Sequence, residues 1–266
     1  MKRSSLFVMQ LLFTLLVCAF MLVPVLMSLL AGLTRNFFVG LSSGLTVDWL
    51  VQVWQAYSPT VWLSLQLAVA CAVCVCVCVI GVPAAYALVR MNNRFSRAFE
   101  ELMVLPVAMP GLASALALLL TYGQFGTFRS SWVFILVGHV LFTLPFLVRP
   151  VMAVMQRQHL PVLEEAAASL GAGPIKRFFS VVVPNSRAGI LAGVLMVVTL
   201  SLGEFNLTWM LHTPMTKTLP VGLADSYASA RLEIASAYTL IFLLMIVPLL
   251  IALQAISARL SRGERR

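Results

Sequence analysis

The chain has 266 residues, of which 61% are hydrophobic and 10% are charged, and its formal net charge is +9. A soluble domain carries about 25% charged residues, so this composition excludes an ordinary soluble protein and indicates a chain that lies mainly in the lipid bilayer. The basic residues are scattered over segments that flank apolar runs, which argues against nucleic-acid binding and for anchoring at anionic headgroups.

Six apolar runs are long enough to cross a bilayer, which takes about 20 residues. The second run exceeds that length, so it either projects beyond the bilayer or consists of two pieces bent at Gly81 or Pro83. In the third run, Pro106, Pro110 and Gly111 predict a kinked helix. The runs lie near 6–31, 59–89, 101–122, 132–155, 189–211 and 235–257.

Lysine and arginine set the predicted orientation, because positively charged loops stay on the cytoplasmic side. With the N-terminus inside, fourteen of these residues are cytoplasmic and four are external, so both termini are predicted to be cytoplasmic. We therefore expect one all-α, polytopic membrane domain over residues 1–266. The four external residues are Arg35, Arg129, Lys217 and Arg231.

Four of the cysteines, Cys71, Cys74, Cys76 and Cys78, fall within the second run. In lipid an open strand would leave its backbone unpaired, so this alternating stretch is predicted to be helical. We expect small reduced thiols that pack against neighbouring helices, and no metal site, because none of the three histidines lies near them in the sequence.

The connection between the fourth and fifth runs, 156–188, is predicted to form two helices. Pro161 suits the first turn of one helix, and Gly171 suits a left-handed stop at its end. Pro174 then opens a second helix, which Pro184 is predicted to end. A plain turn needs far fewer residues, so this loop is a candidate functional element.

The second predicted helix places Ile175, Phe178, Phe179 and Val182 on one apolar face. In the first helix, a run of small alanines permits close approach by a partner protein. The loop is therefore interpreted as a docking element.

The spacing within this loop resembles the EAA loop of ABC importer permeases. That family's pattern is Glu-Ala-Ala, three residues, Gly, nine residues, then Ile-x-Leu-Pro. The sequence departs from the pattern conservatively, with Val181 in place of Ile and Val183 in place of Leu. The residues that the resemblance assigns to ATPase coupling are Glu165, Ala166, Ala167, Gly171 and Pro184.

The resemblance implies a type I ABC importer permease: six transmembrane helices with a cytoplasmic two-helix coupling loop, in the inner membrane of a bacterium. Such a chain is a non-catalytic subunit without a cofactor of its own. ATP and Mg²⁺ are bound by a separate ATPase dimer, and this sequence contains no P-loop motif. The further partners implied are a second permease, expected to be a different chain, and a periplasmic solute-binding protein.

The fifth run carries one carboxylate in its interior, Glu204, between Ser201 and Thr208. These three residues are predicted to form a polar stripe, and Gly203 allows close approach or bending. Two interpretations stay open: Glu204 lines or gates the translocation pathway, or it pairs structurally within the helix interface. His139, in the fourth run, is predicted to be a hydrogen-bonded interior histidine.

The sequence alone leaves the solute class open. The stretch "SLGEF", residues 201–205, resembles the corresponding span of permeases for oxyanions such as sulfate and molybdate, for ferric ion and for 2-aminoethylphosphonate. Spermidine and putrescine permeases are near relatives. The expected function is ATP-driven uptake of a small polar solute from one of these classes, including phosphonate and polyamine uptake.

Two other functions fit six spans less well, an ion-coupled secondary carrier and an intramembrane hydrolase. An ion-coupled secondary carrier would typically show several intramembrane charges, and this chain offers one glutamate. An intramembrane hydrolase needs a Gly-x-Ser nucleophile and a histidine in another span. The stretch "GLSSG", residues 40–44, lies in an external segment, and the run 235–257 has no histidine.

Overall fold

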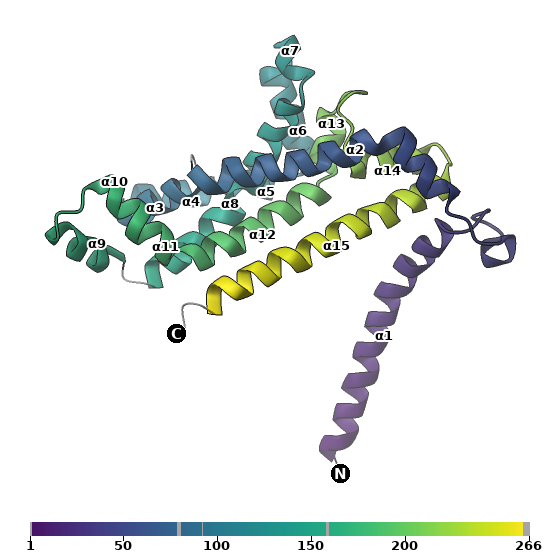
Figure 1. Cartoon of the computed structure of the whole chain (residues 1–266), viewed down its shortest axis with the longest axis horizontal. Coiled ribbons are helices and arrows are strands. Elements are labelled where there is room, and N and C mark those ends of the chain that lie inside the picture. Colours follow the sequence, from purple (N-terminus) through teal and green to yellow (C-terminus); the bar gives the residue numbers. More distant parts are fainter. Residues whose placement is uncertain (1, 79–80, 92, 158–159, 263–266) are drawn as a thin grey trace. The chain divides into compact units, whose positions relative to one another are not determined.

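The computed structural model describes residues 2–78, 81–91, 93–157 and 160–262, and its regular elements are helices (Figure 1). This confirms the all-α fold class. In chain order they are α1 (Lys2–Ala31), η1 (Gly40–Ser43), α2 (Asp48–Ala72), the π-helix η2 (Val73–Cys78), α3 (Gly81–Met91), α4 (Arg94–Leu102), α5 (Leu105–Ala108), α6 (Gly111–Tyr122), α7 (Gly126–Arg129), α8 (Trp132–Arg157), α9 (Leu160–Ser169), α10 (Pro174–Arg177), the π-helix η3 (Phe178–Val182), α11 (Val183–Asn185), α12 (Arg187–Gly203), α13 (Asn206–Leu211), α14 (Leu219–Ala228) and α15 (Leu232–Arg262).

Within the described residues, four helices are each long and apolar enough to cross a membrane: α1, α2, α8 and α15. Two further candidates are bent pairs, so the number rises to six if each pair is one span. The pair 94–108 and 111–122 is bent by 102°, and the pair 174–185 and 187–203 is bent by 71°. The second predicted run comprises most of α2, then η2 and α3, with Gly81 at the start of α3.

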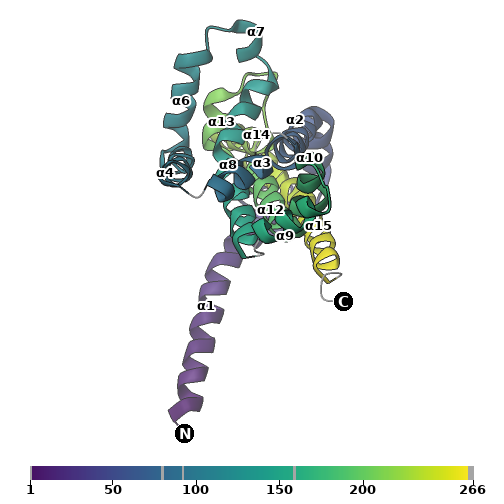
Figure 2. The same cartoon turned by 90° about the vertical axis from the view of Figure 1, so that its left-hand side faces the viewer.

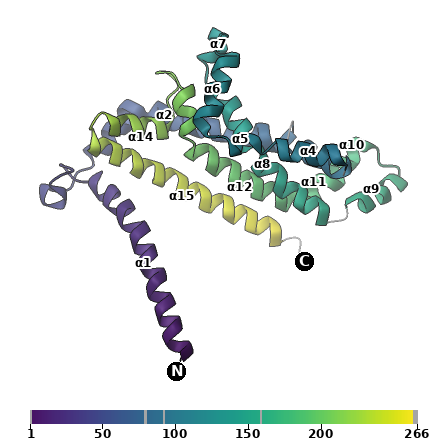
Figure 3. The same cartoon turned by 180° about the vertical axis from the view of Figure 1, so that it is seen from behind.

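The third run is broken, which is a stronger departure from a straight helix than the predicted kink. Met109 is extended (φ −82°, ψ 145°), as expected of a residue before proline, and Pro110 caps α6 with ψ 134°. Both residues therefore leave the helical region, and α6 stands steeply away from α4 and α5 (Figures 2 and 3).

The fifth run, 189–211, is also broken, at Gly203, where the sequence allowed either close helix approach or bending. Gly203 ends α12, and Glu204 adopts an extended conformation (φ −70°, ψ 122°) before α13 begins at Asn206. A Cβ at Gly203 would meet nothing within 4 Å, so this glycine is not required for close packing. The break has a specific cause, which is the side chain of Glu204 described below.

The chain divides into two compact units: residues 1–58 with 222–245, and residues 59–221 with 246–266. In the second unit, α3 and α12 both pack against α8. Its principal core cluster includes Leu147 and Val151 from α8 and Val197 from α12, each fully buried. Cys71 is also fully buried, and its sulfur lies 3.2 Å from the Thr143 hydroxyl oxygen. This agrees with the expectation that the thiol packs against a neighbouring helix.

The α8–α12 crossing is close because Gly189 and Gly193 form a Gly-x-x-x-Gly pair on α12. A Cβ built at Gly193 would lie 2.9 Å from the Cα of Leu147, and one at Gly189 would lie 2.7 Å from the Pro150 carbonyl oxygen. The two helices therefore meet backbone to backbone.

In the first unit, the segment after α1 folds back through an antiparallel bridge between Thr34 and Leu45. The indole N–H of Trp49 donates to the Thr34 carbonyl at 2.9 Å. The carboxylate of Glu233, at the start of α15, accepts from the Phe37 N–H at 2.9 Å. These contacts connect the beginning of α15 to the segment that follows α1.

Candidate functional site

The predicted coupling loop is a helix–turn–helix at one end of the second unit (Figure 1). α9 ends at Ser169, and Gly171 takes a left-handed conformation with φ +83°, as predicted. The Ala172 N–H then donates to the Ala167 carbonyl at 3.0 Å, which closes the helix end. Pro174 opens the second helical segment, also as predicted.

The second segment does not stop at Pro184. It passes through the π-helix η3 and continues as α11 to Asn185, and the chain turns at Ser186 (φ −97°, ψ 0°). Pro184 lies just after the π-helix, at the beginning of α11, so the proline falls at the junction of the two helix types and the helical segment ends one residue later.

The proposed coupling residues lie on different sides of the loop. Glu165, Ala166, Gly171 and Pro184 are exposed, whereas Ala167 is partly buried. The loop therefore presents the glutamate and the first alanine of the motif outward.

The predicted apolar face of the second segment is only half correct. Val182 is fully buried and Phe178 is partly buried, but Ile175 is 76% exposed and Phe179 is 59% exposed. Because the π-helix adds a residue to the turn, it shifts side chains away from the positions of a regular α-helix. Together with Leu170, which is 89% exposed, Ile175 and Phe179 give the loop an uncovered apolar surface.

Sequence reasoning missed a buried carboxylate beside the motif. Glu164 is 3% exposed and contacts Tyr86 and Arg90 from α3. The available signal was its spacing from Leu160, because these two residues lie one helical turn apart and are the buried members of α9.

In the spans, the prediction of a hydrogen-bonded interior His139 is confirmed. Its Nδ1 lies 2.8 Å from the Ser201 hydroxyl, and its Nε2 lies 2.8 Å from the Thr208 hydroxyl. The Thr208 hydroxyl donates to Glu204 at 2.6 Å, so the hydrogen between His139 and Thr208 belongs to Nε2. The three predicted polar residues thus converge on one histidine, although they do not share one continuous helix.

Glu204 explains the break between α12 and α13. Its Oε1 accepts from the Leu207 N–H at 2.7 Å, and its Oε2 accepts from the Thr208 N–H at 2.8 Å. These are N–H groups that a new helix leaves without intrahelical partners, so the carboxylate stabilises the start of α13. With the Thr208 hydroxyl included, three hydrogen bonds occupy this carboxylate.

Both breaks border one cavity of about 230 Å³. A Cβ at Gly111, where α6 begins, would lie 3.1 Å from the Cβ of Asn206, where α13 begins. The Ser114 hydroxyl has no hydrogen-bond partner among the described residues. Glu204 provides the one charged side chain among the residues that line this cavity: Pro106, Met109, Gly111, Ser114, Ala117, Leu118, Thr121, Tyr122, Gly138, Leu141, Phe142, Glu204 and Leu207.

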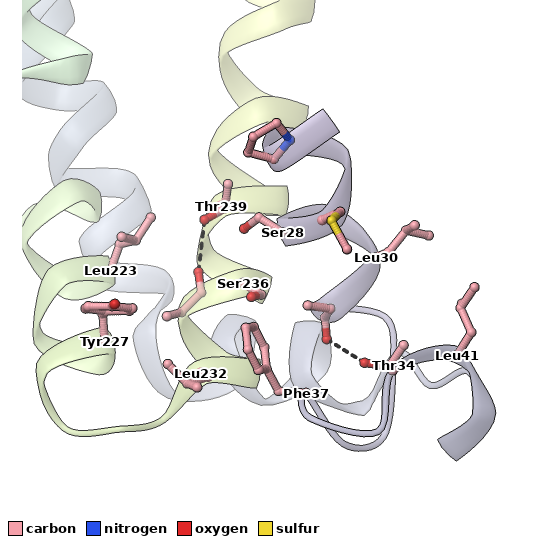
Figure 4. Close-up of a pocket in the computed structure, with 15 residues that line it drawn as sticks. Ser28, Leu30, Thr34, Phe37, Leu41, Leu223, Tyr227, Leu232, Ser236 and Thr239 are labelled. Carbon is pink, nitrogen blue, oxygen red and sulfur yellow. Dashed lines mark hydrogen bonds between the residues drawn. The ribbon is translucent and has the colours of Figure 1, made fainter. Parts of the chain in front are cut away.

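A larger cavity, of about 770 Å³, lies in the first unit (Figure 4). Leu30 of α1, Leu223 and Tyr227 of α14, and Leu232 of α15 contribute to its lining, and hydroxyls such as that of Thr34 supply its polarity. Its lining residues carry no charge, so it is poorly suited to a charged solute.

The sequence matches the family described as "Binding-protein-dependent transport system inner membrane component" over residues 77–262. The chain belongs to this family. It is therefore a multi-pass inner-membrane permease subunit of an ABC importer, non-catalytic and without a cofactor. An importer of this kind works with an ATPase and a solute-binding protein. This membership replaces the carrier and hydrolase interpretations.

The similarity to named relatives extends over most of the length of this permease. The sulfate transport system permease protein CysW of Synechocystis sp. is 29% identical over 67% of this chain and 70% of its own. The putative 2-aminoethylphosphonate transport system permease protein PhnV of Salmonella typhimurium is 25% identical over 91% of each chain. A solved bacterial ABC transporter involved in the import of the acidic polysaccharide alginate shares the fold, with a TM-score of 0.74 at 16% identity over 97% of this chain and 96% of its own.

Proposed function

We propose that this permease forms a translocation pathway with a second permease of different sequence, and that the pathway carries a small anionic solute, an oxyanion or a phosphonate. The observation behind this choice is that three internal hydrogen bonds already occupy the Glu204 carboxylate, the one charged group lining the cavity. A cationic polyamine would need a carboxylate that is free to bind it. Similarity alone does not choose the class, because the relatives include sulfate and 2-aminoethylphosphonate permeases and also the putrescine transport system permease protein PotI of Escherichia coli, 27% identical over 76% of this chain.

Solute selectivity tests the proposal in proteoliposomes that hold the complete complex and its cognate binding protein. We expect ATP-dependent uptake of labelled sulfate, molybdate or 2-aminoethylphosphonate, and no uptake of labelled putrescine or ferric ion. Putrescine uptake would overturn the anionic class, and uptake without ATP would contradict the coupling.

The proposed coupling site consists of Glu165, Ala166, Ala167, Gly171 and Pro184, which contact the ATPase. The exposed apolar side chains of the same loop support this role, because an uncovered apolar surface outside the lipid commonly marks a protein contact. The positive-inside bias supports cytoplasmic termini and a cytoplasmic loop. A thiol placed at Lys176 should accordingly be accessible only from inside, and one at Arg129 only from outside.

We further propose that the two compact units belong to one permease domain over residues 1–266. The helices α2 and α15 each contribute residues to both units, which supports this assignment.

For Glu204 we propose a structural role at the border of the pathway, in company with Ser201 and Thr208. Glu204→Gln keeps one acceptor oxygen but places an amide N–H₂ against groups that donate, so it should destabilise the start of α13 by about 1–3 kcal/mol. We expect a lower melting temperature and a lower yield of assembled complex, measured in detergent.

Ser114→Ala is the matched control for this prediction, because it removes a hydroxyl that lines the same cavity without a hydrogen-bond partner. Its stability should stay at the wild-type level. If Glu204→Gln instead assembled normally and changed only transport, Glu204 would act directly on the solute or the gate.

A further inference from the structure

A cluster of three side chains connects the coupling loop to helix α3: Glu164 is buried, Tyr86 is partly buried and Arg90 is exposed. The side chain of Glu164 is 4% exposed and uses both of its oxygens. Its Oε1 accepts from the Tyr86 hydroxyl at 2.5 Å, and its Oε2 accepts from Nη1 of Arg90 at 3.0 Å. The same Nη1 donates to the Tyr86 hydroxyl at 2.8 Å, so each of the three side chains contacts the other two.

Tyr86 also contacts the second helical segment of the loop. Its ring packs edge-on against Phe178 of η3, with the ring centroids 5.5 Å apart. One tyrosine of α3 therefore contacts α9 through Glu164 and η3 through Phe178. The same residue therefore contacts both helical segments of the loop.

The other side of α3 is part of the core. Val82, Ala85 and Leu88 are buried in the cluster that includes α8 and α12. Because α3 is fixed in this core, a contact between α3 and the loop joins the loop to the spanning helices. The contact is built from a buried carboxylate, and removing the Tyr86 hydroxyl or the Arg90 guanidinium would leave one of its oxygens without that hydrogen bond.

We propose that Tyr86 and Arg90 are positioning residues for transport: they hold Glu164 so that the coupling loop and α3 move together when the ATPase pulls on the loop. The proposal rests on the role assigned above to the loop. It also gives two adjacent glutamates different roles, because Glu165 is exposed and free to meet the proposed ATPase partner, whereas Glu164 is buried against α3.

The consequence is a specific defect, in which ATP hydrolysis is separated from transport. Tyr86→Phe removes one hydroxyl, and Glu164→Gln removes the charge. Either variant should lower solute uptake per ATP hydrolysed at least tenfold in proteoliposomes, while the ATPase still copurifies with the permease. The double variant should be no worse than the more impaired single variant, because both changes disrupt one cluster.

Two substitutions of Arg90 test whether its positive charge is needed for coupling. Arg90→Met keeps an apolar stem without the charge and should show the uncoupled ratio of uptake to hydrolysis. Arg90→Lys restores a positive donor, so it should recover part of the coupling. Glu101→Gln is the matched control, because it neutralises an exposed carboxylate on α4 and should leave the ratio unchanged.

The outcomes separate this inference from the function on which it rests. If Gly171→Val abolishes uptake but the Tyr86, Arg90 and Glu164 variants have the wild-type ratio, the positioning role is overturned and the loop's role stands. If both sets transport normally, the loop itself is not the coupling element. Loss of ATPase copurification in Tyr86→Phe would assign the cluster to folding of the loop and would also overturn the positioning role.

Discussion

Replacing Gly193 by leucine should abolish the yield of folded permease, and replacing it by alanine should lower the melting temperature. A Cβ at this position would lie 2.4 Å from Cδ1 of Leu147 and 2.9 Å from its Cα. The methyl group at the end of the Leu147 side chain can rotate away, but its Cα belongs to α8 and cannot. Inserting the rest of a leucine into this crossing should cost about 3 kcal/mol or more, a large share of the roughly 5–15 kcal/mol that stabilises a typical protein.

Gly126 provides the matched control, because a Cβ built there meets nothing within 4 Å. Gly126→Leu and Gly126→Ala should both retain the wild-type elution profile and melting temperature in detergent. A folded, monodisperse Gly193→Leu variant would show that α8 and α12 can move apart at little cost, contrary to the backbone contact described above.

Replacing Gly171 by valine should abolish solute uptake while the permease still inserts into the membrane. The φ of +83° is unfavourable for any residue with a Cβ, by about 1–2 kcal/mol, and more so for a β-branched side chain. The turn between α9 and α10 would therefore re-form in another geometry, and the exposed surface of the loop would no longer match its partner. Gly171→Ala should show a smaller defect of the same kind.

Gly173 lies two residues away in the same turn, with an ordinary φ of −67° and open space around its Cβ position. Gly173→Ala should therefore transport at close to the wild-type rate. The measurements are ATP-dependent uptake and ATP hydrolysis stimulated by the loaded binding protein. Normal stimulated hydrolysis in Gly171→Val would mean that the shape of this turn does not matter for coupling.

Features determined by local chemistry could be predicted from the sequence. The apolar runs, the helix–turn–helix and the left-handed Gly171 each follow from the composition or conformational preference of a few neighbouring residues. The bend in the third run was anticipated from Pro106 and Pro110, and only its size was underestimated.

Features determined by distant contacts could not be predicted. The spacing of Glu164 from Leu160 indicates that this glutamate faces inward, but its partner Tyr86 lies 78 residues earlier and could not be identified from the sequence. No proline marks the break after Gly203 in the sequence. The break depends on a glutamate that accepts hydrogen bonds from Leu207 and Thr208.

The contact between α6 and α13 has a mechanical consequence. Each of these helices follows its predecessor after a pair of non-helical residues, Met109 with Pro110 and Glu204 with Phe205, so neither pair of helices is continuous. Arg129, at the end of α7, donates to the carbonyl of Leu211, the last residue of α13, at 2.7 Å. A swing of α6 and α13 as one piece would rotate the backbone at these two breaks and break no hydrogen bond inside either helix. The resistance to such a swing would come from side chains: the hydrogen bonds of Glu204 to Leu207 and Thr208, and the hydrogen bond between Thr208 and His139 of α8.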